Sequence, residues 1–350
     1  MPSALPKILV LCCALLAAAC GRAREELVLS GPTMGTTYTV KVVAPPASVD
    51  GARLRETIDE SLAQIDRSMS GYRADSEVAR FNASTSTQWH EVSVELAAIV
   101  EAALHISEKS GGAFDITVAP LVASWGFGPA GPPPQLPGAE QIARTAASVG
   151  FRKLHVRSEP PALRKDVAEL AIDLNGIAPG FAVDVLADRL LALRVENFMI
   201  DIGGEIRARG RNVRSEPWHI AIEHPVDTQR TPYAGVRLDG ASVSTSGEYR
   251  DYYERDGRRY SHTIDPRTAR PLDRAPGSVV VVAPSTALAD GWATALNVLG
   301  PRDGLALAAR EHMPALFIER HAEGWRSQST PEFERYRVRR RLDRMNRMDR

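Results

Sequence analysis

The chain has 350 residues, which is enough for one large domain or two ordinary ones. Hydrophobic residues make up 44% of it and charged residues 25%, the composition of a globular protein. The formal net charge is zero, so the overall charge does not support binding to nucleic acid, and we expect no nucleic-acid partner.

The first residues are typical of an export signal. Lys7 precedes the uncharged run Ile8 to Ala19, which is too short to span a bilayer but suits a signal peptide. Ala17-Ala18-Ala19-Cys20 is similar to a bacterial lipobox, in which the cysteine carries the lipid. We therefore predict a lipoprotein signal peptide over residues 1–19 and lipidation at Cys20. An ordinary signal peptide cleaved at the same point is the alternative.

Cysteine usage agrees with export and anchoring. The chain has 3 cysteines, and two of them, Cys12 and Cys13, fall in the predicted signal peptide. The mature chain would have no pair for a disulfide and no cysteine metal site. Several acyl chains on Cys20 would hold the protein stably on a membrane. We expect a lipid-anchored protein of the cell envelope.

The first half of the chain alternates between strand and helix patterns. After a charged tether over residues 20–27, the Thr- and Val-rich segment Leu27 to Val43 predicts a strand or hairpin. Apolar residues spaced by three and four predict a helix over Asp50 to Met69. A second helix is predicted over Val92 to Lys109, with glycines as its stop signal, and the Pro- and Gly-rich segment 128–138 predicts a loop.

The second half has short apolar runs bounded by turn residues, which predict strands. They lie at 154–156, 171–174, 198–202, 218–222, 236–238 and 279–282. Helices are predicted at 179–193 and 287–299. Strands and helices are mixed without strict alternation or a break in composition, which predicts an α+β fold in a single domain.

The end of the chain, residues 331–350, is rich in arginine. Arg335 to Arg350 contains eight arginines and two aspartates. Two interpretations are open: a solvated, partly helical or disordered end, or a basic strip that lies on anionic lipid.

Two segments of the last third suggest phosphoryl-type chemistry. Asp290 and Thr294 are spaced four apart, so a helix would place both on one face. Two such oxygen ligands suit Mg²⁺. His262, three residues before Asp265, offers a base for a nucleophile. The simpler alternatives are a helix N-cap for Asp290 and a packed side chain for Thr294.

The segment Ile172 to Asp184 is expected to run from a strand into a helix. Gly176 and Gly180 allow the backbone to approach a ligand, and a helix N-terminus offers free N–H groups to anions. The segment is neither a Walker A loop nor a dinucleotide fingerprint. Phosphate binding and a purely structural role are both open. Gly203-Gly204 predicts a bulge or a turn at a strand end.

Six segments in this order together resemble the ApbE family of flavin transferases, over residues 28–330. They are Thr33-Met34-Gly35-Thr36, Ala113-Phe114-Asp115-Ile116-Thr117, Asp173 to Asp184, Gly203-Gly204-Glu205, Ser261-His262-Thr263-Ile264-Asp265-Pro266 and Ala289 to Leu296.

The resemblance implies a single T-fold-related domain and a Mg²⁺-dependent enzyme. Such an enzyme splits FAD and transfers its FMN half through a phosphoester bond to a Thr or Ser hydroxyl of an acceptor flavoprotein, releasing AMP. The implied acceptors are flavoprotein subunits of membrane electron-transport complexes, on the periplasmic side. The alternatives are an FAD pyrophosphatase that produces FMN and AMP, and a flavin-binding lipoprotein without turnover.

The resemblance also implies residue roles. His262 would be the general base, and Asp265 would orient this histidine or a metal-bound water. Asp290, Thr294 and the carbonyl of Ala178 would bind the metal. The implied FAD site is formed by Met34, Tyr72, Ala113, Phe114, Asp115, Asn175, Phe181 and Ile264.

One departure from the family pattern stands out. Pro179 occupies a position where many members have lysine, which removes a positive charge near the expected phosphates. Asn175, where glycine is common, and Phe181, where tyrosine is common, are milder changes.

Overall fold

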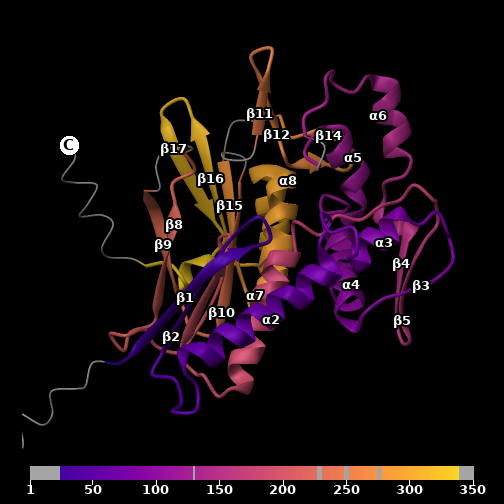
Figure 1. Cartoon of the computed structure of the whole chain (residues 1–350). Coiled ribbons are helices and arrows are strands. Elements are labelled where there is room, and N and C mark those ends of the chain that lie inside the picture. The colour runs from indigo at the N-terminus through magenta and orange to yellow at the C-terminus, as the bar shows by residue number, and fades with distance from the viewer. Residues whose placement is uncertain (1–23, 129–130, 227–230, 248–251, 274–276, 339–350) are drawn as a thin grey trace, which may run out of the picture.

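The structure is a computed structural model, shown in Figure 1, and it describes residues 24–128, 131–226, 231–247, 252–273 and 277–338. Its helices are α2 (Gly51–Met69), α3 (Glu77–Ala83), α4 (Val94–Lys109), α5 (Ala119–Ser124), α6 (Ala139–Ala146), α7 (Ala178–Ala192) and α8 (Thr286–Arg310), with short 3₁₀ turns at Ile116–Val118, Phe151–Lys153 and Phe333–Arg335. The predicted signal peptide and Cys20 lie outside the described residues. Within those residues, no helix is both long and apolar enough to cross a membrane.

The centre of the fold is an eight-stranded sheet in which every neighbouring pair is antiparallel. Its order is β1 (Glu26–Thr33), β2 (Thr36–Val43), β6 (Phe198–Ile202), β7 (Glu205–Arg209), β10 (Ala241–Gly247), β15 (Gly277–Ala283), β16 (Ala315–His321) and β17 (Gly324–Ser329). Smaller sheets are formed by β3 (His90–Glu91), β5 (Pro161–Lys165) and β4 (Leu154–Ser158), by β8 (Trp218–Glu223) and β9 (Pro232–Leu238), by β11 (Tyr252–Arg255) and β12 (Arg258–Ser261), and by β13 (Ile264–Asp265) and β14 (Arg270–Pro271).

The main sheet separates two hydrophobic cores. Strand β15 shows why, because Val279 and Val281 pack into one core and Val280 and Val282 into the other. Side chains alternate between the faces of a strand, so a continuous run of valines indicates burial on both sides. Helices α2, α7 and α8 cover the first face, and the β8–β9 hairpin covers the second.

Helix α7 packs unusually close to the start of α8. A Cβ atom added to Gly180 would lie 2.5 Å from the carbonyl oxygen of Thr286, so only glycine allows this contact. One turn later, the Asp184 carboxylate accepts hydrogen bonds from the backbone N–H groups of Thr286 and Ala287, each at 2.9 Å. The two helices are therefore fixed relative to each other near the N-terminus of α8.

Most predicted elements of the first half are confirmed. Leu27 to Val43 forms the β1–β2 hairpin, and α2 begins where Asp50 caps it by accepting the N–H of Arg53 at 2.9 Å. The second predicted helix is α4. The described part of segment 128–138 contains no helix or strand.

Two predictions in the second half need correction. The strand predicted at 171–174 is wrong: this segment has no strand partner, and the Asn82 side chain satisfies both the N–H and the carbonyl of Ile172, at 2.7 and 2.9 Å. The helix predicted to end at 299 continues to Arg310 after a break at Gly300, whose φ is 76°.

The ordered structure extends past the predicted domain boundary at residue 330. Phe333 is completely buried in the second core, and the backbone of Tyr336 and Val338 bonds to Arg237 and Gly235 beside β9. Residues 331–338 therefore belong to the folded domain. The remainder of the arginine-rich tail lies outside the described residues.

We predict that Gly180→Ala destabilises the protein, because the added methyl group meets backbone rather than a movable side chain. The free energy of unfolding should fall by about 1–3 kcal/mol in chemical denaturation. Gly51→Ala is the matched control, since a Cβ at this helical glycine has nothing within 4 Å. Equal stabilities of the two variants would contradict the close packing of α7 on α8.

We predict that Phe333→Ala removes a part of the second core. The free energy of unfolding should fall by about 3–5 kcal/mol, the usual loss for a buried phenylalanine. Phe333→Leu keeps most of the apolar volume and should lose much less. If the alanine variant were as stable as wild type in denaturant titrations, residues 331–338 would not contribute to the fold.

Candidate functional site

Several of the motif turns meet at one end of the main sheet. The Met34-Gly35 turn joins β1 to β2, and the Gly203-Gly204 turn joins β6 to β7. Tyr38 pairs with Ile202, so both turns lie at the same end. Strand β10 runs toward this end as well, and the segment that follows it carries His262. The tertiary structure therefore brings distant motifs together there.

The three predicted metal ligands lie close together. Asp290 and Thr294 are one turn apart on α8, and Asp290 accepts the backbone N–H of Gly180, in the first turn of α7, at 3.1 Å. A Cβ atom on Gly176 would lie 3.2 Å from the Thr294 hydroxyl. Ala178, the first residue of α7, lies between these two contact points in the chain. Ser285 is the N-cap of α8, so Asp290 is free of that structural role.

Asp290 faces a second carboxylate that the sequence analysis did not assign. Burial raises the pKa of Asp290 to about 7. Burial, and next the charge of Asp290, raises the pKa of Glu205 well above its usual range. Two buried carboxylates near each other are stabilised by a cation. Glu205 belongs to the Gly-Gly-Glu motif, whose glycines form the turn, but nothing in the motif itself indicates that its carboxylate reaches α8.

The donors present fit a divalent cation such as Mg²⁺. A carboxylate, a hydroxyl and a backbone carbonyl are hard oxygen ligands, and Mg²⁺ usually keeps further positions for water or phosphate oxygens. Within the part of the chain that the structure describes, no group of three or more His, Cys, Asp or Glu side chains could hold a metal. A cation bound here would therefore need oxygens from solvent or substrate as well.

His262 lies half-buried between β12 and β13. Burial raises the pKa of Asp173, whereas the charge of His262 acts in the opposite direction, so the two side chains interact electrostatically. Asp173 also accepts the N–H of Asn175 at 2.8 Å, at the start of the loop that leads to Ala178. The candidate base thus faces the same loop as the candidate metal ligands.

Asp265 has a different set of contacts from the one expected. It forms a two-point ion pair with Arg267, with Nε donating to Oδ1 at 2.9 Å and Nη2 to Oδ2 at 2.8 Å. Its backbone carbonyl accepts the N–H of Ala269 at 2.8 Å. These contacts stabilise the turn after His262. A role in orienting the histidine or a metal-bound water stays a prediction.

Three predicted FAD residues form the buried base of the loop that leads from Asp173 to Ala178. Ala113 and Phe114 are buried, and Phe114 borders both Gly176 and Gly291. Asp115 is buried too, and its carboxylate accepts the backbone N–H groups of Thr117 at 2.8 Å and of Phe151 at 2.7 Å. Burial raises the pKa of Asp115 despite these bonds. Its observed contacts are structural.

The other predicted FAD residues differ in their exposure. Met34 is partly buried in the β1–β2 turn, Asn175 is exposed, and Ile264 is buried beside Trp125. Tyr72, just after α2, is 65% exposed, so its ring is accessible for stacking. Contact of these residues with FAD stays a prediction.

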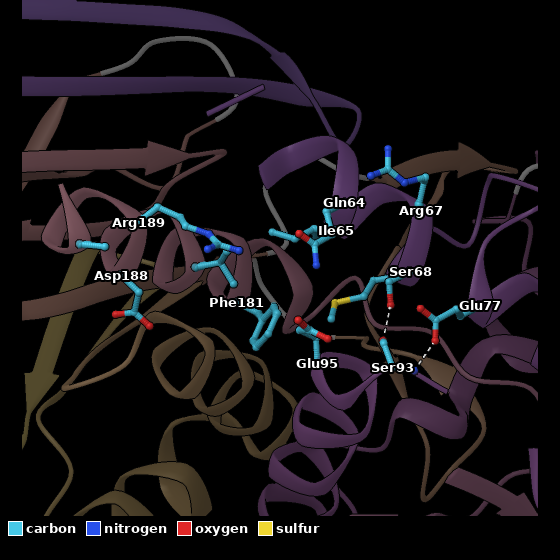
Figure 2. Close-up of a pocket in the computed structure, with 13 residues that line it drawn as sticks. Gln64, Ile65, Arg67, Ser68, Glu77, Ser93, Glu95, Phe181, Asp188 and Arg189 are labelled. Carbon is cyan, nitrogen blue, oxygen red and sulfur yellow. Dashed lines mark hydrogen bonds between the residues drawn. The ribbon is translucent and has the colours of Figure 1, made fainter. Parts of the chain in front are cut away.

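A cavity of about 370 Å³ lies beside Phe181, between α2, α4 and α7 (Figure 2). Its rim carries charges of both signs, including Arg67, Arg189 and Glu95. Ser68 and Ser93 are hydrogen-bonded at 3.2 Å within it. Phe181 is the predicted FAD residue that lines this cavity. Contact of Phe181 with FAD stays a prediction.

Comparisons with known proteins identify relatives of the chain. The ApbE family model matches residues 34–317. A curated FAD:protein FMN transferase of Vibrio cholerae is 42% identical over 91% of this chain and 95% of its own length. The FAD:protein FMN transferase of Escherichia coli K12 is 39% identical over 90% of each chain.

Solved structures show the same fold. The flavin transferase ApbE from Vibrio cholerae aligns with a TM-score of 0.83 at 40% identity, covering 89% of this chain and 99% of its own. The apo form of the Pseudomonas stutzeri flavinyl transferase ApbE aligns with a TM-score of 0.81 at 42% identity, covering 89% and 96%. The predicted α+β, single-domain fold is confirmed. The chain belongs to the ApbE family.

Proposed function

We propose that this protein is an FAD:protein FMN transferase. It transfers the FMN moiety of FAD to a Thr or Ser hydroxyl of an acceptor flavoprotein and releases AMP. The observation that carries this proposal is the meeting of Asp290 and Thr294 on α8 with the first turn of α7, at the end of a loop whose Asp173 interacts electrostatically with His262. The curated relatives, 42% and 39% identical, support the same reaction.

The reaction forms one bond and breaks one. The acceptor hydroxyl oxygen bonds to the phosphorus on the FMN side of the pyrophosphate, and the bond from this phosphorus to the bridging oxygen breaks. The electron pair leaves with AMP. His262 accepts the hydroxyl proton, a task for which an imidazole is suited near neutral pH. The carboxylate of Asp173, which interacts electrostatically with His262, would stabilise the imidazolium that results.

Asp290, Thr294 and the carbonyl of Ala178 would hold Mg²⁺. When bound, this ion neutralises the charge of the pyrophosphate. The residues themselves have two further tasks. Asp290 fixes the first turn of α7 by accepting the Gly180 N–H, and Gly176 leaves the Thr294 hydroxyl uncovered because it has no side chain. Pro179 adds no positive charge at this turn, so the metal would be the main counter-charge there.

The cellular setting is part of the proposal. A lipid anchor at Cys20 would place the enzyme on a bacterial membrane, facing the periplasm. Acceptor subunits of membrane electron-transport complexes would be within reach of such an enzyme. The short apolar run and the lipobox-like residues before Cys20 support this.

Mass spectrometry of a candidate acceptor tests the function. The protein lacking its first 21 residues is incubated with FAD, Mg²⁺ and acceptor. An added mass of phosphoester-linked FMN on Thr or Ser is the expected result. AMP and free FMN without modified acceptor would favour a pyrophosphatase, and intact FAD would favour a flavin-binding protein.

We predict that His262→Ala lowers the rate of acceptor modification by about 10²–10⁴-fold, the usual contribution of a general base. Binding of FAD, followed by flavin fluorescence, should change little. His219→Ala, at an exposed position on β8, is the control and should react like wild type. Unchanged transfer by His262→Ala would exclude His262 as the base.

We predict that Asp290→Asn weakens Mg²⁺ binding by on the order of tenfold or more, because a neutral amide replaces the one charged ligand. Isothermal titration measures this directly, and the Mg²⁺ dependence of transfer should shift in parallel. Asp303→Asn, exposed on the same helix, is the matched control. Identical metal titrations of both variants would place the ion elsewhere.

A further inference from the structure

Trp125 contacts both flanks of the segment that carries His262. Its indole ring is buried at the end of α5, a helix that contributes none of the predicted site residues. Before His262, the ring of Tyr260 stacks on Trp125, with centroids 6.1 Å apart and planes at 25°. After His262, the Trp125 Nε1–H donates to the carbonyl of Ala269 at 2.9 Å. The segment between these two contacts contains the candidate base.

The contact before His262 continues as a column of aromatic rings. Tyr253 of β11 stacks on Tyr260 of β12, with centroids 5.2 Å apart and planes at 17°. The ring centroid of Phe127 lies 5.2 Å from that of Tyr253. The Tyr253 hydroxyl donates to the carbonyl of Trp125 at 2.9 Å, so Tyr253 is bonded directly to the residue at the other end of the stack. The β11–β12 hairpin is thereby fixed to the end of α5.

The contact after His262 lies in the same buried cluster. Ile264 and Ala269 pack there with Trp125, Leu121 and Ile142. The turn between them is closed by the pairing of Asp265 with Arg270 and by the bond of the Leu272 N–H to the Thr263 carbonyl at 3.0 Å. Both flanks of His262 are therefore held by one side chain.

These anchors are needed because the local strands are too short to hold the histidine by themselves. Strands β11 and β12 have 4 residues each, and β13 and β14 have 2 each. A two-stranded hairpin of this size is marginal in water without packing from outside. The β11–β12 hairpin projects beyond the main sheet (Figure 1).

We propose that Trp125 is a positioning residue for His262. Through Tyr260 on one side and the Ala269 carbonyl on the other, it sets where the imidazole lies relative to the loop with Asp173. This inference rests on the proposed function, in which His262 accepts the proton of the acceptor hydroxyl. Trp125 touches neither substrate nor metal in this proposal.

The test compares two buried tryptophans that make the same kind of bond. Trp125→Phe keeps an aromatic ring but removes the hydrogen bond to Ala269. Trp218→Phe removes an equivalent bond, from Nε1 to the Arg209 carbonyl at 3.0 Å, in the core on the other face of the sheet. The two tryptophans are 4% and 5% exposed, so similar losses of stability are expected. Only Trp125 flanks the site.

We expect Trp125→Phe to lower kcat for acceptor modification by on the order of tenfold, since small displacements of a reacting group slow catalysis strongly. The KM for FAD and Mg²⁺ binding should stay at wild-type values. Trp218→Phe should lose similar stability but keep its kcat. Equal kcat values in the two variants would overturn the proposal.

A second measurement does not depend on activity. In protein with ¹⁵N-labelled histidine rings, the His262 signals are those that disappear in His262→Ala. They should shift or broaden in Trp125→Phe and stay unchanged in Trp218→Phe. Unchanged His262 signals in Trp125→Phe would overturn the positioning role. If wild type itself modified no acceptor, the proposed function would fail, and the ring signals would still decide the role of Trp125.

Discussion

The carboxylate of Asp184 connects the elements on which the site depends. From α7 it accepts hydrogen bonds from the Ser285 hydroxyl and from the backbone at the start of α8, and it forms an ion pair with Arg207 of β7 at 2.7 Å. This one group fixes two helices and a sheet strand relative to one another. The register it sets brings Gly180 to Asp290 and Gly176 to Thr294. A partly buried carboxylate that accepts the free N–H groups of a helix N-terminus is a stable arrangement.

The carboxylates of Asp290 and Glu205 lower the stability of the folded protein when both are charged. Burial raises the pKa of both carboxylates, and the charge of Asp290 raises that of Glu205 further, which means that the folded protein holds them unfavourably in their charged forms. Strained electrostatics of this kind is typical of functional sites. A divalent cation and the phosphates of a nucleotide would together relieve the repulsion, which gives the acidic pair a purpose that packing alone does not.

The two halves of the proposed chemistry have separate supports. The metal-side residues lie on long helices packed on the main sheet, whereas His262 lies in a long connection between β10 and β15 that depends on α5 and its aromatic column. A base on its own support can be aligned with different acceptors without disturbing the core. Four aromatic residues, Trp125, Phe127, Tyr253 and Tyr260, form that column.

The sequence by itself determined the long helices, the apolar strands, the α+β class and, through six ordered motifs, the family. It did so because helix and strand periodicities and short motifs are local properties. Only the tertiary structure showed that 171–174 is not a strand, since the partner of Ile172 is the side chain of Asn82, 90 residues away. The tertiary structure also revealed strand β10, whose buried Ser242 and Ser244 give no hydrophobic signal in the sequence. It further showed the interaction of Glu205 with Asp290 and the ion pair of Asp265 with Arg267. These features depend on which distant residues come into contact, and that is decided by packing rather than by local pattern.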